Sequence, residues 1–323
     1  MTILTGNIAT RLVQNNWDVN ALRTNATLRK DEWIRLDQTV IRTARIRLNA
    51  VADVVSRGFV DRINGLRTQI LQWERESRTE EVNVSMDPQV LGRSEAVDFD
   101  LVSLPLPIFH ANYTIGIRQL ETSRNTGQPL NTSMARNKTR DVAEKVEDTL
   151  VNGLDGYKYG SGSDQGTVYG YLDFPDRGTY TIPAAWDLPA TTGKDIVTDV
   201  LAMRQLAIDA KHYGPYILYV PANYEGKLDE DYSENKGDNT IRERILNIDS
   251  IEEVKVLDTL PDDNVVLVQM TRDTVEMVEG LPLSNTEWDT RGGMSHNFMI
   301  WTIMIPRLIS DYEGNCGIVQ GSV

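Results

Sequence analysis

The sequence predicts an α+β fold, and three observations lead to that class. The chain has 323 residues, of which 40% are hydrophobic, and this is enough to bury a substantial core. Several segments repeat apolar residues at every third or fourth position, as amphipathic helices do. Other segments alternate apolar with polar residues, as half-buried strands do. We therefore expect helices and strands to share the core.

The N-terminal part begins with a polar arm and continues into a helix. Residues 1–27 are Asn-rich and only weakly periodic. From Leu28 toward Gly58 the apolar residues recur at steps of three and four, which predicts one amphipathic helix that must lie against another surface. Its apolar face comprises Trp33, Leu36, Val40, Ala44, Leu48, Val51 and Val55.

A long hairpin follows. Residues 69–74 and 96–106 alternate like strands, and the polar segment between them contains proline and glycine. Such a hairpin has no core of its own, so it needs a partner surface, either the rest of the fold or another subunit. The next strand places Phe109 on one face and His110 on the other.

The clearest helix covers residues 131–153, with Asn131 or Thr132 as its cap and Gly153 at its end. Residues 157–193 show no helical period and predict loops and short strands. Beyond them the pattern predicts a second mixed unit and a closing strand that returns to the first sheet. The expected helices are 195–212 and 240–247, and the expected strands are 214–221, 251–257, 265–271 and 296–308.

Charge is distributed unevenly along the chain, whose net charge is −14. Residues 1–80 hold 13 Lys and Arg against 9 Asp and Glu, whereas the remaining residues hold 20 against 38. This argues against a protein that grips nucleic acid with its whole surface, but it permits an arm that faces a polyanion. A solvated Arg-rich helix is an equal alternative.

The residues that carry chemistry are sparse. The three histidines, His110, His212 and His296, are scattered, and HExxH, CxxC and GxSxG do not occur. The glycine-rich residues 159–170 lack the Walker lysine, and the acidic residues 228–239 lack the ligand spacing of a calcium loop. We therefore expect no catalytic residue, no cofactor and no metal, and we interpret His110 as a strand residue at an exposed or intersubunit face.

Two further properties concern the compartment. Cys316 is the single cysteine, which excludes an intramolecular disulfide framework. The longest apolar run, residues 298–305, is far shorter than the roughly 20 residues of a membrane span, and no signal peptide is visible. The expectation is a protein made in the cytoplasm with no membrane partner.

One block of sequence resembles a known family. The run LPLPIFHANYTIGIRQLETSRNTGQPLNTSMARNKTRDVAEKVEDTLVNG, residues 104–153, is similar to the core block of encapsulin-type shell proteins and of tailed-phage major capsid proteins. Upstream, KDEWIRLDQTVIRTARIRL resembles a helix of the same group, and downstream ILYVP, the acidic loop, TIRERI and the closing strand follow in the expected order. The resemblance covers nearly the whole chain and is weakest at residues 157–193.

The resemblance implies the tailed-phage major capsid fold. That fold has an N-terminal arm, an extended hairpin called the E-loop that reaches over a neighbouring subunit, a peripheral domain built on a spine helix, and an axial domain near the symmetry axes. The corresponding segments are residues 1–65 for the arm and its helix, 66–104 for the E-loop, 105–194 with 296–323 for the peripheral domain, 131–153 for the spine, and 195–295 for the axial domain.

Within that plan, two groups of residues are candidates for contacts. The intersubunit candidates on the hairpin are Ile70, Trp73, Arg75, Arg78 and Phe99. The candidates for facing DNA inside the shell are Arg11, Arg23, Arg29, Arg35, Arg42 and Arg45. Some capsids of this fold join their subunits by an isopeptide bond from an E-loop lysine, but residues 66–104 contain no lysine.

The function implied is that of a phage major capsid protein, which self-assembles into pentamers and hexamers of an icosahedral head and encloses DNA. Its implied partners are further copies of itself, packaged DNA, and portal, scaffolding or decoration proteins, and its location is the virion after assembly in the host bacterial cytoplasm. The alternative is an encapsulin nanocompartment that encloses a cargo enzyme. The added segment 157–193 and an arm with many arginines but few lysines favour the virus.

Overall fold

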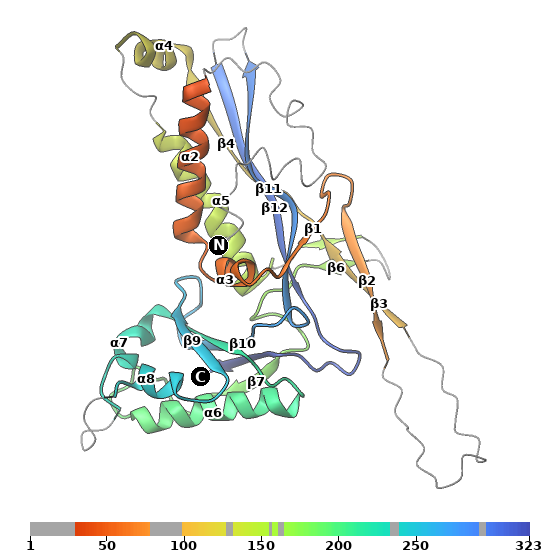
Figure 1. Ribbon diagram of the computed structural model, residues 1–323, viewed down its shortest axis with the longest axis vertical. Coiled ribbons are helices and arrows are strands. Elements are labelled where there is room, and N and C mark those ends of the chain that lie inside the picture. The colour runs from red at the N-terminus through yellow and green to blue at the C-terminus, as the bar shows by residue number, and fades with distance from the viewer. Residues whose placement is uncertain are drawn as a thin grey trace, which may run out of the picture.

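The computed structural model describes residues 30–77, 99–126, 132–154, 157–160, 165–232, 239–290 and 295–323. A long four-stranded sheet runs along the greatest dimension of the molecule, and a five-stranded sheet lies at one end of it (Figure 1). None of the helices in these ranges combines the length and the apolar composition needed to cross a membrane.

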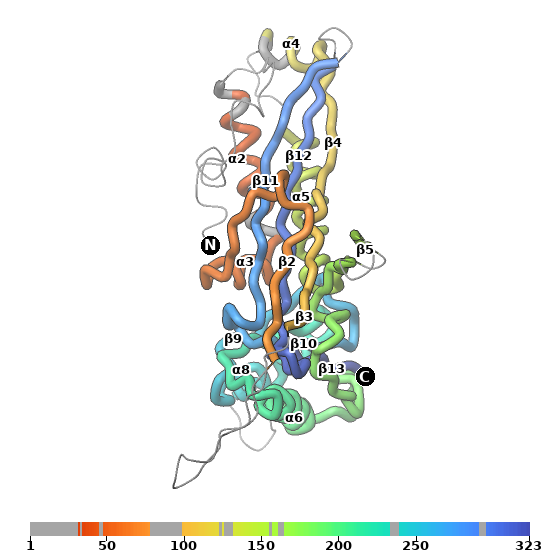
Figure 2. The backbone as a smooth tube through the Cα atoms, turned by 90° about the vertical axis from the view of Figure 1, so that its right-hand side faces the viewer, coloured from red at the N-terminus to blue at the C-terminus, as the bar shows by residue number. Residues whose placement is uncertain are grey.

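The long sheet has the strand order β1-β11-β12-β4. Its members are β1 (Val60–Arg62), β4 (Phe109–Gly116), β11 (Val275–Thr290) and β12 (Ser295–Leu308). Figure 2 shows β11, β12 and β4 side by side along the long axis. Because β12 pairs antiparallel with β4, the predicted return of the closing strand to the first sheet is confirmed.

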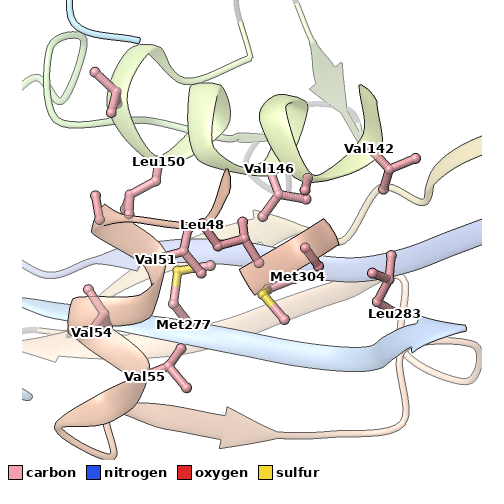
Figure 3. Close-up of a cluster of buried hydrophobic side chains, with 14 of the residues drawn as sticks. Leu48, Val51, Val54, Val55, Val142, Val146, Leu150, Met277, Leu283 and Met304 are labelled. Carbon is pink, nitrogen blue, oxygen red and sulfur yellow. The ribbon is translucent and has the colours of Figure 1, made fainter. Parts of the chain in front are cut away.

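Helices cover one face of this sheet. The spine helix α5 (Ser133–Asn152) packs on β4 and β12, and α2 (Lys30–Arg47) packs on α5. The core between the layers is aliphatic and includes Met277 and Met304 from the strands and Val146 and Leu150 from α5 (Figure 3). The helix predicted over residues 131–153 is confirmed, with Thr132 in the cap position and Gly153 ending the helix at a positive φ of 73°.

The N-terminal helix differs from its prediction. Instead of one helix toward Gly58, the chain forms α2 and then α3 (Ala50–Ser56), with a break at Leu48 and Asn49. The reason is tertiary: the Glu147 side chain on α5 accepts hydrogen bonds from the backbone N–H groups of Asn49, Ala50 and Val51. A carboxyl group from another helix thus satisfies the amides at which α3 begins.

The five-stranded sheet has the order β7-β13-β10-β8-β9. Its strands are β7 (Gly178–Thr181), β8 (Tyr216–Val220), β9 (Ile251–Val256), β10 (Asn264–Gln269) and β13 (Ile318–Ser322). The helices α6 (Gly193–Asp209) and α8 (Ile241–Leu246) accompany it, and each begins with a capping box, at Thr192 and Thr240. The predicted helices and strands of this second unit are therefore confirmed, and η2 (Ala222–Tyr224) and α7 (Glu225–Leu228) lie between them.

The boundaries between the two units differ from the predicted segments. Strand β11 (residues 275–290) lies in the segment that was predicted as axial, yet it belongs to the long sheet. Conversely, β7 and β13 fall in segments predicted as peripheral, yet they belong to the five-stranded sheet. The sequence of β11 hid this strand because Gly280 and Pro282 interrupt its alternation, and the structure accommodates them with register shifts next to Leu281.

The hairpin stands apart as its own two-stranded sheet. Strands β2 (Ile70–Glu76) and β3 (Phe99–Pro105) pair antiparallel, with Trp73 opposite Val102. The hairpin lies on the opposite side of the long sheet from α2 (Figures 1 and 2).

Two smaller features complete the described part of the fold. Helix α4 (Ile117–Thr126) was not predicted, and β5 (Lys158–Tyr159) pairs with β6 (Gly166–Thr167) in the segment predicted to hold short strands.

Candidate assembly and nucleic-acid surfaces

The three histidines occupy separate elements. His110 is exposed on β4, opposite Trp301 of β12, as its strand-face interpretation predicts. His212 follows α6, and its Nδ1 lies 2.6 Å from Oε1 of Gln269. His296 is buried on β12. No two of them come together in a site.

His296 does join two carboxylates that the sequence analysis did not single out. Its Nδ1 lies 2.8 Å from Oδ1 of Asp289 and 3.5 Å from Oε1 of Glu287. The ligand atoms of the three side chains all lie within 4.8 Å of one another, which is close enough for a single metal ion. Only the pairing register, which sets Asp289 opposite His296 across β11 and β12, reveals this cluster. The hydrogen bond between the His296 imidazole and the Asp289 carboxylate accounts for their proximity equally well.

The base of the hairpin is fixed to its own chain by Arg75. The Arg75 guanidinium lies 2.6 Å from Oδ2 of Asp100, 3.2 Å from Oδ2 of Asp176 and 2.9 Å from Oγ of Ser310. These partners come from the hairpin itself, from the segment after α5 and from the chain after β12. Arg75 was predicted as an intersubunit contact, and the structure gives its guanidinium group three partners within the chain.

Trp73 lies at the same place. It is half-buried against the cluster of Leu104, Val278 and Ile305, and the Arg307 guanidinium lies 5.5 Å from the centre of its ring. An open cavity of about 300 Å³ adjoins Trp73 and Arg75. The base of the hairpin therefore packs on its own chain. This was one of the two partner surfaces that the sequence allowed.

The other predicted hairpin contacts have different surroundings. Phe99 is 59% exposed and Leu101, two residues farther along β3, is 46% exposed. Ile70 is half-buried at the start of β2. Arg78 lies outside the described residues. Phe99 and Leu101 thus present apolar surface that the described part of the chain leaves uncovered.

The arginines predicted to face DNA are only partly described. Arg11, Arg23 and Arg29 lie outside the described residues, as does the side chain of Arg45. Arg35 and Arg42 are exposed on α2, and together with Arg136 of α5 they line an open groove of about 380 Å³. Arg136 was missed because nothing in the sequence shows that the first turn of α5 adjoins α2.

Two buried ionisable groups lie in the body of the fold. Burial raises the pKa of Glu147 to about 7, against the opposing effect of its three backbone hydrogen bonds. Burial likewise raises the pKa of the Cys316 thiol to about 12. A buried thiol with such a pKa is protonated at neutral pH and is a poor nucleophile.

The chain matches a family model over residues 20–321, and that family is described as a family of unknown function, DUF6260. It belongs to the DUF6260 family. Because the match spans both sheets, the helical layer and the hairpin, the family and the fold coincide in extent.

The fold of this DUF6260 chain is similar to that of several solved structures. The virus-like particle protein of Pyrococcus furiosus superposes with a TM-score of 0.63 at 16% identity, over 89% of this chain and 98% of that one. The capsid of Myoviridae phage XM1 gives a TM-score of 0.63 at 9% identity, over 83% and 90%. The capsid of the native GTA particle gives 0.56 at 13% identity, over 93% and 92%. The predicted capsid fold is therefore confirmed for the DUF6260 chain.

Proposed function

We propose that this protein is the major capsid protein of a tailed phage, which self-assembles into pentamers and hexamers of an icosahedral head that encloses DNA. One observation carries the proposal: the match to the capsid of the native GTA particle extends over more than nine-tenths of both chains. A likeness of this extent is not confined to the long sheet. Its role is structural, and its location is the virion after assembly in the cytoplasm of a bacterial host.

The uncovered apolar surface of the hairpin supports self-association. Phe99 and Leu101 are exposed on a two-stranded sheet that projects from the body of the molecule. Burial of these side chains against a neighbouring copy would supply the free energy that the hairpin lacks within its own chain. Phe99 and Leu101 are therefore the hairpin residues best placed to contact another subunit. Trp73 and Arg75 instead hold the base of the hairpin through contacts within the chain.

DNA is the proposed content of the shell, held by contacts without sequence preference. The basic N-terminal part and the exposed Arg35 and Arg42 support this, because arginine attracts phosphate regardless of sequence. Portal, scaffolding and decoration proteins are the further partners that a phage head would need. The alternative is a nanocompartment shell around a cargo enzyme, and the likeness to the Pyrococcus furiosus virus-like particle keeps it as the second candidate.

Expression of the full chain without partners tests the proposal. We expect rings or closed shells by electron microscopy and large particles by light scattering. Phe99→Asp should reduce assembly because it places a charge in the hairpin interface, whereas Phe99→Leu, which keeps an apolar side chain, should assemble. A chain that stays monomeric at every pH and salt concentration would contradict the proposal.

A further inference from the structure

A groove between α2 and the first turn of α5 gathers positive charge on an acidic protein. Arg35 and Arg42 come from α2 and Arg136 from α5, and no carboxylate is among the described residues that line the groove. The remaining lining residues are Gln38, Thr39, Thr43 and Thr132. In a chain with a net charge of −14, three guanidinium groups beside one groove create a local site for an anion.

The helical spacing explains why the arginines share this face. Leu36 and Val40, on the inner face of α2, are completely buried. Arg35 and Arg42 are seven residues apart, which is two helical turns, so they lie on one side of the helix beside the buried face. At 1.5 Å of rise per residue, their Cα atoms are about 10 Å apart along the helix axis.

The guanidinium groups are available to a ligand. Arg35 and Arg42 are exposed, and neither forms an ion pair with a described carboxylate. Arg136 is also exposed and donates to Oγ of Ser133 at 3.3 Å. The hydroxyls of Thr39 and Thr43 instead donate to backbone carbonyls of α2 at 2.8 Å. The positively charged donors that face the groove are therefore those of the three arginines.

We propose that this groove binds the sugar–phosphate backbone of DNA through Arg35, Arg42 and Arg136, an inference that rests on the proposed function for the presence of DNA. A guanidinium group matches the geometry of phosphate oxygens and can bind them bidentately. Phosphates of one strand advance about 3.4 Å along the duplex axis. The separation of about 10 Å between the two α2 arginines thus suits a run of about three phosphates better than one small anion.

The test measures how salt weakens the binding of a duplex. Fluorescence anisotropy of a labelled duplex follows binding to the full-length chain, at concentrations where light scattering detects no shells. The test variant is Arg35→Gln/Arg42→Gln/Arg136→Gln. The control variant, Lys194→Gln/Lys211→Gln/Arg244→Gln, removes the same charge from exposed positions of the five-stranded unit. Circular dichroism verifies that both variants fold.

Each phosphate contact contributes about 0.9 to the slope of log affinity against log salt concentration. The slope should fall by about 2 to 3 in the groove variant and stay near the wild-type value in the control. An unchanged slope in the groove variant, or an equal fall in the control, overturns the proposal. Displacement of the duplex by inorganic phosphate or poly-glutamate as readily as by unlabelled DNA, at equal charge concentration, overturns the assignment to DNA.

Electron microscopy of the same proteins at higher concentration, where assembly is expected, separates this inference from the proposed function. If the wild type assembles but the groove variant keeps its salt slope, only the groove proposal fails. If the wild type stays monomeric while the slope falls as expected, the groove proposal holds and the shell proposal fails.

Discussion

At the scale of the residue, Glu147 decides how the N-terminal helices join the body. Its side chain is buried on α5, and its carboxyl oxygens accept hydrogen bonds from the three backbone N–H groups at which α3 begins. Burial raises its pKa from the ordinary 4.5 to about 7. Between pH 4.5 and about pH 7, Glu147 therefore keeps its proton in the folded state but has lost it in the unfolded chain.

This predicts that Glu147 makes stability depend on pH. Its contribution is complete below about pH 4.5 and is lost as the pH rises through about 7, because the folded state binds more protons across that range. The interval between the two pKa values corresponds to a free energy on the order of 3 kcal/mol. In denaturant titrations at pH 5 and pH 8, the stability advantage of wild type over Glu147→Gln should shrink by that order as the pH rises.

Glu144→Gln is the matched control for this measurement. Glu144 lies three residues before Glu147 on α5, and its side chain is 45% exposed beside Arg140. Its contribution should be small at both pH values, as for other surface ion pairs. Equal pH profiles for wild type and Glu147→Gln would contradict the assigned role of Glu147.

At the scale of the element, the hairpin combines a fixed base with an exposed outer strand. Trp73 packs against the long sheet, and Arg75 binds Asp176 and Ser310 beyond the hairpin. Among the described residues, nothing covers the outer Phe99 and Leu101 to a comparable extent. The base is thus ordered by the chain itself, while β3 carries exposed apolar side chains.

Removal of the Trp73 side chain should loosen this base. Trp73→Ala loses the packing against Leu104 and Val278 and the contact with the Arg307 guanidinium. Because the side chain is only half-buried, we expect a loss of about 2 to 3 kcal/mol, near the lower end for such truncations. Hydrogen exchange should accelerate in β2 and β3 and stay unchanged in α5. Trp73→Phe, which keeps an aromatic ring, should show most of the wild-type protection.

At the scale of the whole molecule, we predict that contacts between copies of the chain are non-covalent. Residues 66–104 contain arginines but no lysine, so they lack the amine that an isopeptide bond requires. Cys316 is the single cysteine and is buried, with its pKa raised to about 12, which makes it unsuited to disulfide exchange. Cohesion then depends on apolar burial and charge-assisted contacts repeated over many interfaces.

Denaturing electrophoresis tests this conclusion. Particles boiled in detergent without a reducing agent should dissociate to one band near 36.4 kDa, the mass of the chain. The same band should appear when a reducing agent is present, because no disulfide contributes. A ladder of covalent oligomers in either lane would contradict the prediction.

The sequence by itself determined most of the regular elements and, through resemblance, the fold. The apolar spacing of Val142, Val146 and Leu150 predicts the spine helix, and the alternation around Tyr113 predicts β4 and its buried face. These patterns are local, because each depends on which side of one element contacts the core. The cap position at Thr132 and the glycine stop at Gly153 likewise act within a single turn.

The tertiary structure decided what depends on partners distant in sequence. The break before α3 requires Glu147, 97 residues beyond Ala50, and the meeting of His296 with Asp289 requires the register of β11 and β12. The basic groove likewise exists only because α2 lies on α5, which brings Arg136 beside Arg35 and Arg42. Periodicity identifies the face that an element buries, but it does not identify the element that covers that face. For that reason the contacts and the candidate groove follow from the fold, whereas the helices and strands follow from the sequence.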